Sequence, residues 1–379
     1  MSKADFGHTL VEVIMGAKIV RFPIGLITAI VLFAAPVLAQ TLEKVFQDKG
    51  VIWSLAFPPD GRILYTLRSG ELKVYDPRTQ SATLITGTPQ VFAKGQGGLL
   101  EVALAPDFAT SKTIYLTYAK DLGERQSTAL ARANWEGTEL KNLRELFVAK
   151  PGTKEGVHYA GKLVFDKDSI LLTVGDRGER DLAQKLDNHM GKVLRLTLDG
   201  QPYPDNPFTK TKGALPEIYS YGHRNPQGAT LHPKTGELWV HEHGPRGGDE
   251  INRVTAGKNY GWPVITYGKE YWGPNIGEGT KKSGMEQPVH YYVPSIAPSG
   301  LMIYNGDRYP EWKNQFLIGS LVQTHLNVVA IEETSFKSET RFFADQSPRI
   351  RDVRVSPDDW IYLATDQGIV YRVLPALKK

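Results

Sequence analysis

The sequence predicts an all-β protein folded as a six-bladed β-propeller. Beyond residue 40 no long stretch has convincing helical periodicity, whereas one unit recurs six times: an apolar strand, a turn rich in Pro, Asp and Gly, and a second apolar strand. The repeat is roughly 57 residues long, a period typical of propellers and solenoids. That length accommodates a four-stranded blade and a loop, and a propeller displays its loops around a central channel. A pair of β-sandwiches is the structural alternative.

The six units follow one another along the chain as hairpins. They span residues 54–66, 102–118, 162–173, 229–240, 300–319 and 353–365. In the same order, the turns contain Pro-Pro-Asp-Gly, Pro-Asp, Asp-Lys-Asp, His-Pro-Lys-Thr-Gly, an insertion between the two strands, and Ser-Pro-Asp-Asp. Pro fixes φ, Asp bonds to nearby backbone, and Gly reaches positive φ, so these residues favour tight turns. Each hairpin is expected to supply two strands of one blade.

The composition excludes several classes of protein. The chain has 379 residues, 41% of them hydrophobic, which is ample for a large core. Its formal net charge is +4 and the charges are interspersed, so the clustered Lys/Arg footprint of a nucleic-acid binder is missing from the sequence. There is no cysteine, which excludes disulfides, thiolate metal sites and a cysteine nucleophile.

The N-terminus has the pattern of a secretory signal. Lys18 and Arg21 precede an apolar run from Phe22 to Leu38, and Val37 and Ala39 suit cleavage after Ala39. The run is short for a membrane span, although a retained N-terminal anchor is the alternative. The expectation is therefore a periplasmic or secreted protein with no stable membrane span after signal cleavage.

These features divide the chain into two parts. Residues 1–39 are predicted to be an N-terminal extension and signal peptide, and residues 40–379 a single propeller domain.

Two polar regions of that domain are candidate functional regions. The window 220–262 crowds arginine, asparagine, histidine, acidic and Gly-Pro residues around one strand, and loops displayed by a rigid sheet commonly carry function. The longest polar loop, 268–285, contains Tyr271 and Trp272, which suit stacking on a flat ligand.

A histidine and an aspartate lie at matching ends of one predicted hairpin. His158 precedes the first strand of the third unit, and Asp176 follows the second strand in Gly-Asp-Arg-Gly. Paired strands would bring the two side chains together, and a carboxylate that holds an imidazole fixes its tautomer and raises its basicity. The alternative is a surface histidine near a turn aspartate.

The segment after the fourth hairpin is rich in oxygen ligands. Gly244 and Pro245 form a turn whose exposed carbonyls suit a hard cation such as calcium, and Asp249 and Glu250 follow it. Two histidines, at 241 and 243, alternate on one strand face, which is also compatible with a transition metal, but no third ligand of that kind is evident. An ordinary Asx-type turn is the structural alternative.

Two arginines begin the last hairpin. Arg349 and Arg351 flank one residue, so on a strand both point to the same face and could clamp carboxylates. Arg224 and Asn225 could add a second anchor for an anionic ligand. A solvated basic strand edge is the alternative.

Taken together, these residues resemble the soluble PQQ-dependent aldose sugar (glucose) dehydrogenases. The resemblance spans essentially the whole mature chain and rests on the order and number of several short motifs. They are Gly-Gln-Gly-Gly-Leu-Leu (95–100), the His158 region, Gly-Asp (175–176), Tyr-Gly-His-Arg-Asn-Pro-Gln-Gly (221–228), Glu-His-Gly-Pro (242–245), Asp-Glu-Ile-Asn (249–252), Lys-Asn-Tyr-Gly-Trp-Pro (258–263) and Arg-Ile-Arg-Asp-Val (349–353). The family is a six-bladed propeller, in agreement with the repeat count.

The resemblance implies a mechanism and a set of site residues. His158 is expected to be the general base, with Asp176 orienting it; hydride would pass from C1 of an aldose to PQQ, leaving an aldonolactone. Contacts to PQQ are expected from Gln96, Arg224, Asn225, Tyr271, Arg349 and Arg351. Calcium at the quinone is expected on the carbonyls of Gly244 and Pro245, and a second, structural calcium at Glu250 and Tyr260. The implied partners are an aldose and an unidentified electron acceptor, with no nucleic acid, in a monomer or homodimer.

One position departs from the family pattern. A lysine that contacts PQQ commonly follows Gly-Ser/Ala-Leu in the fifth blade, whereas here Gly-Ser-Leu at 319–321 is followed by Val322. Loss of that cation is expected to weaken cofactor binding or to alter quinone activation, unless Gln323 or His325 substitutes. Two other functions stay open on this fold: a non-catalytic secreted propeller that binds a glycan or a protein, and a calcium-dependent lactonase.

Overall fold

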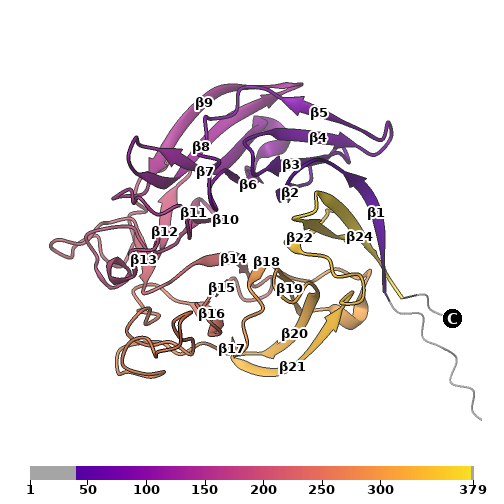
Figure 1. The fold of residues 1–379 in the computed structure, drawn as a ribbon. Helices are drawn as coiled ribbons and strands as arrows, with labels where there is room; N and C mark the ends of the chain where they lie inside the picture. Colours follow the sequence, from indigo (N-terminus) through magenta and orange to yellow (C-terminus); the bar gives the residue numbers. More distant parts are fainter. Residues whose placement is uncertain (1–39, 377–379) are drawn as a thin grey trace, which may run out of the picture. The chain divides into compact units, whose positions relative to one another are not determined.

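The computed structural model describes residues 40–376, and the predicted signal peptide lies outside these residues. Six antiparallel four-stranded sheets form the blades of a ring, with β2, β6, β10, β14, β18 and β22 innermost (Figure 1). The predicted all-β fold and the six blades are thereby confirmed. Within residues 40–376, helix is confined to three short segments between strands: α1 (Phe108–Ser111), η1 (Arg180–Gln184) and η2 (Pro310–Trp312).

Five blades are each made of four consecutive strands. The first two blades contain β2 (Ile52–Ala56), β3 (Ile63–Leu67), β4 (Leu72–Asp76) and β5 (Ser81–Ile85), then β6 (Leu99–Leu104), β7 (Thr113–Asp121), β8 (Gln126–Glu136) and β9 (Glu139–Val148). The next two contain β10 (Ala160–Asp166), β11 (Ser169–Val174), β12 (Lys192–Thr197) and β13 (Ile218–Tyr221), then β14 (Pro226–Leu231), β15 (Leu238–Glu242), β16 (Asp249–Val254) and β17 (His290–Tyr292). The fifth contains β18 (Pro298–Ile303), β19 (Phe316–Ser320), β20 (Leu326–Glu332) and β21 (Ser335–Phe342).

The last blade closes the ring with strands from both ends of the described chain. Its order is β22 (Ile350–Val355), β23 (Ile361–Thr365), β24 (Ile369–Leu374) and β1 (Thr41–Gln47). The N-terminal strand is therefore the outer strand of the C-terminal blade, and it pairs antiparallel with β24 from Thr41↔Leu374 to Gln47↔Ile369. Backbone hydrogen bonds between the two ends thus take the place of a covalent link in closing the ring.

Each hairpin predicted from the sequence forms the two innermost strands of a blade. These strands are mostly buried, and their apolar residues fill the space between neighbouring blades. One such cluster contains Leu64 and Leu72 from one blade with Leu116 and Ala131 from the next, all at most 1% exposed. Burying apolar area in this way contributes about 25 cal/mol for each Å². The core therefore lies between the blades, which fixes the angle at which each blade presents its loops.

All six innermost strands carry a β-bulge close to their first residues. The extra residue is Trp53 in β2, Gln227 in β14 and Arg351 in β22, and equivalent register shifts occur in β6, β10 and β18. A bulge locally increases twist and redirects the side chain that it leaves unpaired. The repeated bulges therefore mark one end of the innermost strands as a place where side chains are re-aimed.

Next to the bulges, a buried ionic cluster joins three blades. Lys162 of β10 donates from Nζ to Glu101 of β6 and to Asp352 of β22, both at 2.9 Å. Arg354 of β22 donates to the same two carboxylates, with Nε 2.8 Å from Asp352 Oδ2. Two cations thus balance two carboxylates that are at most 1% exposed. Because an unpaired buried charge is costly, the cluster ties these three innermost strands together.

Candidate active site

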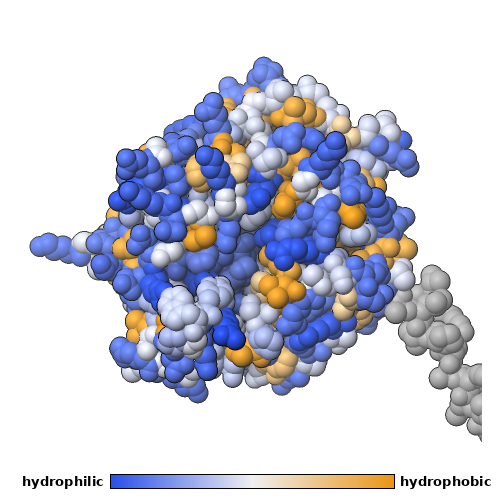
Figure 2. Space-filling view, in the orientation of Figure 1, coloured by the Kyte–Doolittle hydropathy of each residue, from blue (hydrophilic) through white to orange (hydrophobic). Residues whose placement is uncertain are grey.

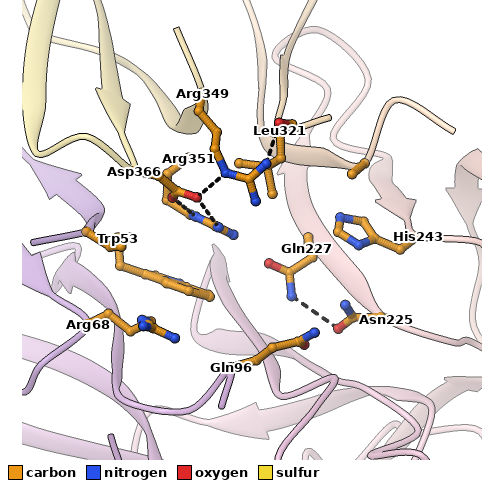
Figure 3. A pocket seen from close by; sticks show the side chains of 12 residues that line it. Trp53, Arg68, Gln96, Asn225, Gln227, His243, Leu321, Arg349, Arg351 and Asp366 are labelled. Carbon is orange, nitrogen blue, oxygen red and sulfur yellow. Dashed lines mark hydrogen bonds and ion pairs between the residues drawn. The ribbon is translucent and has the colours of Figure 1, made fainter. Parts of the chain in front are cut away.

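A cavity of about 300 Å³ opens at the bulged ends of the innermost strands. Figure 2 shows a hollow near the middle of this face, bordered largely by hydrophilic side chains. Figure 3 shows the side chains that line it, which come from four different blades and the loops beside them. The lining residues are Val51, Trp53, Arg68, Gln96, Asn225, Gln227, His243, Ala297, Leu321, Arg349, Arg351 and Asp366.

The two predicted clamp arginines share one carboxylate on the cavity wall. Arg349 Nε lies 2.7 Å from Asp366 Oδ2, and Arg351 donates from Nε and NH2 at 2.8 and 3.0 Å. Burial raises the pKa of Asp366, but the hydrogen bonds from the two guanidinium groups outweigh burial and hold the pKa below its ordinary value. The guanidinium of Arg351 also lies 4.5 Å from the centre of the Trp53 ring. Asp366 therefore fixes both guanidinium groups while neutralising only one of their charges.

His158 and Asp176 lie side by side next to this cavity. The distance from His158 Nδ1 to Asp176 Oδ1 is 2.6 Å, and the His158 main-chain N–H donates to Gln96 Oε1 at 2.8 Å. His158 has a φ of 54°, a conformation that non-glycine residues rarely adopt. Gly175 permits it, because a Cβ at that position would overlap the His158 carbonyl oxygen. His158 does not itself line the cavity, but it is hydrogen-bonded to Gln96, which does.

Asp176 is 1% exposed and is held by further donors. Its Oδ2 accepts from Trp262 Nε1 at 2.8 Å, and its Oδ1 accepts from the Gly178 main-chain N–H at 2.9 Å. Burial raises the pKa of Asp176, but the His158 contact, the charge of Arg224 and the Gly178 hydrogen bond together outweigh burial and lower the net pKa. Burial lowers the pKa of His158, and the Asp176 carboxylate opposes that effect. An ionised Asp176 therefore accepts the Nδ1 proton and leaves His158 Nε2 as the free basic nitrogen.

Arg224 connects the dyad to the Gly-Pro turn. Its carbonyl accepts from the Asp176 main-chain N–H at 2.7 Å, and its own N–H donates to Glu242 Oε2 at 2.5 Å. The guanidinium donates from NH1 to the Gly244 carbonyl at 2.9 Å and lies 5.3 Å from the centre of the Trp262 ring. Arg224 therefore lies outside the first cavity, unlike Asn225 beside it, which lines that cavity.

A second cavity of about 680 Å³ adjoins the first and shares His243 and Ala297 with it. Its lining includes the predicted residues Gly244, Pro245 and Tyr271, together with Val322. Tyr271 and Val322 are 65% and 61% exposed, so they form an open apolar rim. The predicted substitutes for the missing lysine are elsewhere: Gln323 Oε1 accepts from Arg341, and buried His325 bonds to Asn327, and neither lines a described cavity.

A third, much smaller cavity of about 10 Å³ is acidic. Its lining includes the predicted pair Glu250 and Tyr260, together with Glu242 and Gly244. Burial and the neighbouring Glu242 carboxylate raise the pKa of Glu250 to about 8. The Tyr260 hydroxyl already donates to the Arg253 carbonyl at 2.8 Å, so Tyr260 could offer a cation only its main-chain oxygen. Two buried carboxylates around a space of this size are suited to one hard cation.

The two alternating histidines do not form a transition-metal site. His243 Nε2 lies 2.6 Å from the Pro298 carbonyl, and His241 Nε2 lies 3.4 Å from the Gly300 carbonyl. Burial lowers the pKa of both, for His241 to about 4, so both are neutral and bond across the blade interface. Within residues 40–376 no three His, Cys, Asp or Glu side chains are grouped as metal ligands. The transition-metal alternative therefore has no structural support.

Several residues that build the site were not identified from the sequence. Trp53 lies in no motif, and Gln227 lies in the 221–228 motif but was given no role; each occupies a bulge and lines the cavity. Asp366 could have been predicted from the sequence, because it follows the strand next to the two arginines and an acidic side chain there is their natural partner. Arg68, Glu242 and Trp262 were likewise given no role from the sequence, and His243 was considered only as a metal ligand, whereas it lines the first cavity.

Comparisons with known sequences find relatives along nearly the whole chain. The family model described as glucose / sorbosone dehydrogenase matches residues 50–372. Aldose sugar dehydrogenase of Escherichia coli strain K12 is 42% identical over 355 residues, covering 91% of this chain and 95% of that protein. Quinoprotein glucose dehydrogenase B of Acinetobacter calcoaceticus is 28% identical and covers 86% of this chain and 87% of its own length.

Solved structures agree with the sequence comparisons. The apo-form of the soluble aldose sugar dehydrogenase of Escherichia coli superimposes with a TM-score of 0.86 at 39% identity, covering 88% of this chain and 99% of that one. The PQQ-bound form of aldose sugar dehydrogenase from Streptomyces coelicolor has a TM-score of 0.74 at 26% identity, covering 90% and 99%.

Proposed function

The chain belongs to the glucose / sorbosone dehydrogenase family, and from this premise we propose that it oxidises aldose sugars at C1 to aldonolactones with PQQ and calcium. The family resemblance drawn from the sequence motifs is thereby confirmed, and the chain is an aldose sugar dehydrogenase of this family. The observation that carries the mechanism is the contact of 2.6 Å between His158 and Asp176 at the edge of an arginine-lined cavity.

The first cavity suits a planar anionic cofactor. Three guanidinium groups and only one carboxylate line it, and the amides of Gln96, Asn225 and Gln227 add hydrogen-bonding groups. Its volume is at the lower end of the range for small-molecule sites. When bound, PQQ would supply the quinone that accepts a hydride, which carries the two electrons of the oxidation. Arg349 and Arg351 would hold its carboxylates, and Gln96 and Asn225 would contact it from other parts of the same lining. Tyr271 would act from the second cavity and Arg224 from the third.

The two proposed calcium sites differ in whether their oxygen atoms are free to bind a cation. Glu250 in the small acidic cavity fits a hard cation, because its raised pKa reflects the repulsion that a cation would relieve. The site at the carbonyls of Gly244 and Pro245 is less available, because the Arg224 guanidinium already donates a hydrogen bond to the Gly244 carbonyl. Arg224 would have to turn away for that carbonyl to ligate a cation. When bound there, calcium would supply a Lewis acid.

His158 is the proposed base. Nδ1 is held by Asp176, so Nε2 is free to take the proton from the C1 hydroxyl, and no described residue hydrogen-bonds to Nε2. As the imidazole becomes cationic, the buried Asp176 carboxylate stabilises the new charge. Gln96 fixes the main chain of His158, so the ring is positioned before substrate binds.

The same family membership supports proposals about domain organisation, localisation and assembly. We propose that residues 1–39 are a secretory signal, that residues 40–379 form one propeller, and that the enzyme works in the periplasm or outside the cell as a monomer or homodimer, passing electrons to a separate acceptor. Among the described residues, no helix has the length and apolar content to cross a membrane.

The decisive experiment is a dye-reduction assay with glucose on the purified mature protein, with PQQ and calcium added together and separately. We expect activity only with both, and its loss in His158→Ala. His232→Ala, which removes a histidine from the turn of the fourth hairpin, should leave the activity unchanged. An inactive wild-type protein across an aldose panel, with no PQQ absorbance retained after gel filtration, would refute the proposed function.

A further inference from the structure

Arg68 is a cation of the first cavity that no protein carboxylate neutralises. It follows β3 and lines the cavity beside Trp53 and Gln96, away from Asp366 (Figure 3). The other two arginines of the cavity are both paired with Asp366. Among the described residues, Arg68 forms no ion pair; its NH1 donates to the main-chain carbonyl of Gly95 instead.

The surrounding backbone holds Arg68 in place. Its N–H donates to the Val51 carbonyl at 3.0 Å, and its carbonyl accepts from the Leu99 N–H at 3.2 Å. Gly98 makes room for it, because a Cβ there would overlap the Arg68 carbonyl oxygen and would lie 2.7 Å from its Cγ. Position 68 is therefore anchored between two neighbouring blades, and its guanidinium is directed by the Gly95 carbonyl. Such fixed geometry is what a binding residue requires.

The charge balance of the cavity indicates what Arg68 would bind. Three guanidinium groups face one carboxylate, so the lining has a formal excess of two positive charges. Cations in partly buried sites are normally compensated, and a guanidinium prefers planar carboxylates, which it can bind through two parallel hydrogen bonds. The uncompensated charge therefore calls for an anionic ligand with at least two carboxylates.

The position of Arg68 separates it from the arginine pair. Arg349 and Arg351 come from the last blade, whereas Arg68 comes from the adjoining first blade, and Trp53 lies between Arg351 and Arg68 (Figure 3). A ligand that contacts the cations on both sides of Trp53 needs more than one acidic group. At residue 322, where the family pattern has a lysine, this chain has an exposed valine.

We propose that Arg68 binds a carboxylate of the cofactor other than those held by Arg349 and Arg351, and so supplies a cationic contact in this chain despite Val322. The proposal rests on the proposed function, because it takes the cofactor to be PQQ, an aromatic tricarboxylate.

Direct binding tests the proposal without reference to turnover. The quench of tryptophan fluorescence on titration with PQQ in the presence of calcium gives Kd for the wild type, Arg68→Gln and Arg78→Gln. Arg78 is a matched control: it is in the same blade, its side chain is 72% exposed, and it pairs with Asp76 away from the cavity. Loss of a charge-assisted contact should raise Kd about 10- to 100-fold in Arg68→Gln and leave Arg78→Gln unchanged.

The trimethyl ester of PQQ, which lacks the carboxylate charges, distinguishes recognition from a change of cavity shape. Arg68→Gln should bind the ester as tightly as the wild type does, and Arg68→Lys should keep part of the affinity for PQQ. Equal PQQ affinity in wild type and Arg68→Gln, or an equal loss for PQQ and its ester, would overturn the role of Arg68 and leave the proposed function standing. A wild-type protein that binds no PQQ would overturn both. If Arg68→Gln fails to fold, Arg68→Met, which also removes the charge, replaces it, and unchanged PQQ affinity in that variant then counts against the proposal.

Discussion

Trp262 should set the protonation behaviour of the proposed catalytic pair His158 and Asp176, although it is far from both in sequence. Its Nε1 donates to Asp176 Oδ2 at 2.8 Å, and the acceptor carboxylate is 1% exposed. Trp262→Phe keeps an aromatic ring and removes this donor. A hydrogen bond to a charged group contributes about 1.5–3 kcal/mol, so its removal should raise the pKa of Asp176.

The sign of the effect on stability follows from the direction of the shift. The pKa of Asp176 is lowered in the folded state, so its ionisation contributes stability above the unfolded pKa, and that stability is lost as pH falls through the folded pKa. Raising the folded pKa reduces this contribution. At about 2.1 cal/mol/K for each residue, a domain of about 340 residues loses roughly 2–4 °C in Tm for 1.5–3 kcal/mol.

The assay is the pH profile of kcat/KM for an aldose with saturating PQQ and calcium. The acid limb, which reports the dyad as a coupled pair, should move to higher pH in Trp262→Phe while the alkaline side changes little. Trp239→Phe is the control, because the buried Trp239 N–H has no hydrogen-bond partner in the structure. A folded Trp262→Phe enzyme with an unchanged acid limb would show that this hydrogen bond has no part in setting the basicity of the dyad.

Three further perturbations test other parts of the structure. Gly175→Ala should nearly abolish turnover, because its Cβ overlaps the His158 carbonyl oxygen; wild-type kcat in a folded variant would contradict this. Because the folded pKa of Glu250 is raised from its ordinary 4.5 to about 8, the metal-free protein should lose stability as pH rises between these values. Calcium should remove this pH dependence and release protons when it binds. Thermal melts with and without chelator measure the stability, and calorimetry in two buffers measures the proton release. Arg354→Met leaves Glu101 with one cation fewer and should cost about 3–5 kcal/mol in urea unfolding; an unchanged midpoint would show that the central cluster does not tie the blades together.

The dyad could be predicted from the sequence because both members belong to one hairpin. His158 precedes the first strand and Asp176 follows the second, and antiparallel pairing necessarily places those two positions together. The same reasoning placed Arg349 and Arg351 together. It did not show that Arg351 occupies a bulge, or that Asp366, beyond the neighbouring strand, would hold both guanidinium groups.

The cavity as a whole could not be predicted in this way. Trp53, Arg68, Gln227 and His243 are separated by up to 190 positions, and nothing in their local sequence marks them as neighbours. Their meeting depends on the ring of blades and on bulges that turn individual side chains inward. The hydrogen bond from the Arg224 guanidinium to the Gly244 carbonyl likewise depends on the tertiary structure, and it makes that carbonyl less available to calcium.

By itself, the sequence determined the strand content, the number of blades, the hairpin turns and the His158–Asp176 pair, because each depends on apolar periodicity or turn chemistry over a few tens of residues. Only the tertiary structure decided that β1 completes the last blade, that a buried ionic cluster joins three innermost strands, and that one cation of the cavity, Arg68, has no carboxylate partner within residues 40–376. These features arise from pairing and packing between distant segments. Their energies depend on which groups meet and how far they are buried, and no local pattern encodes either.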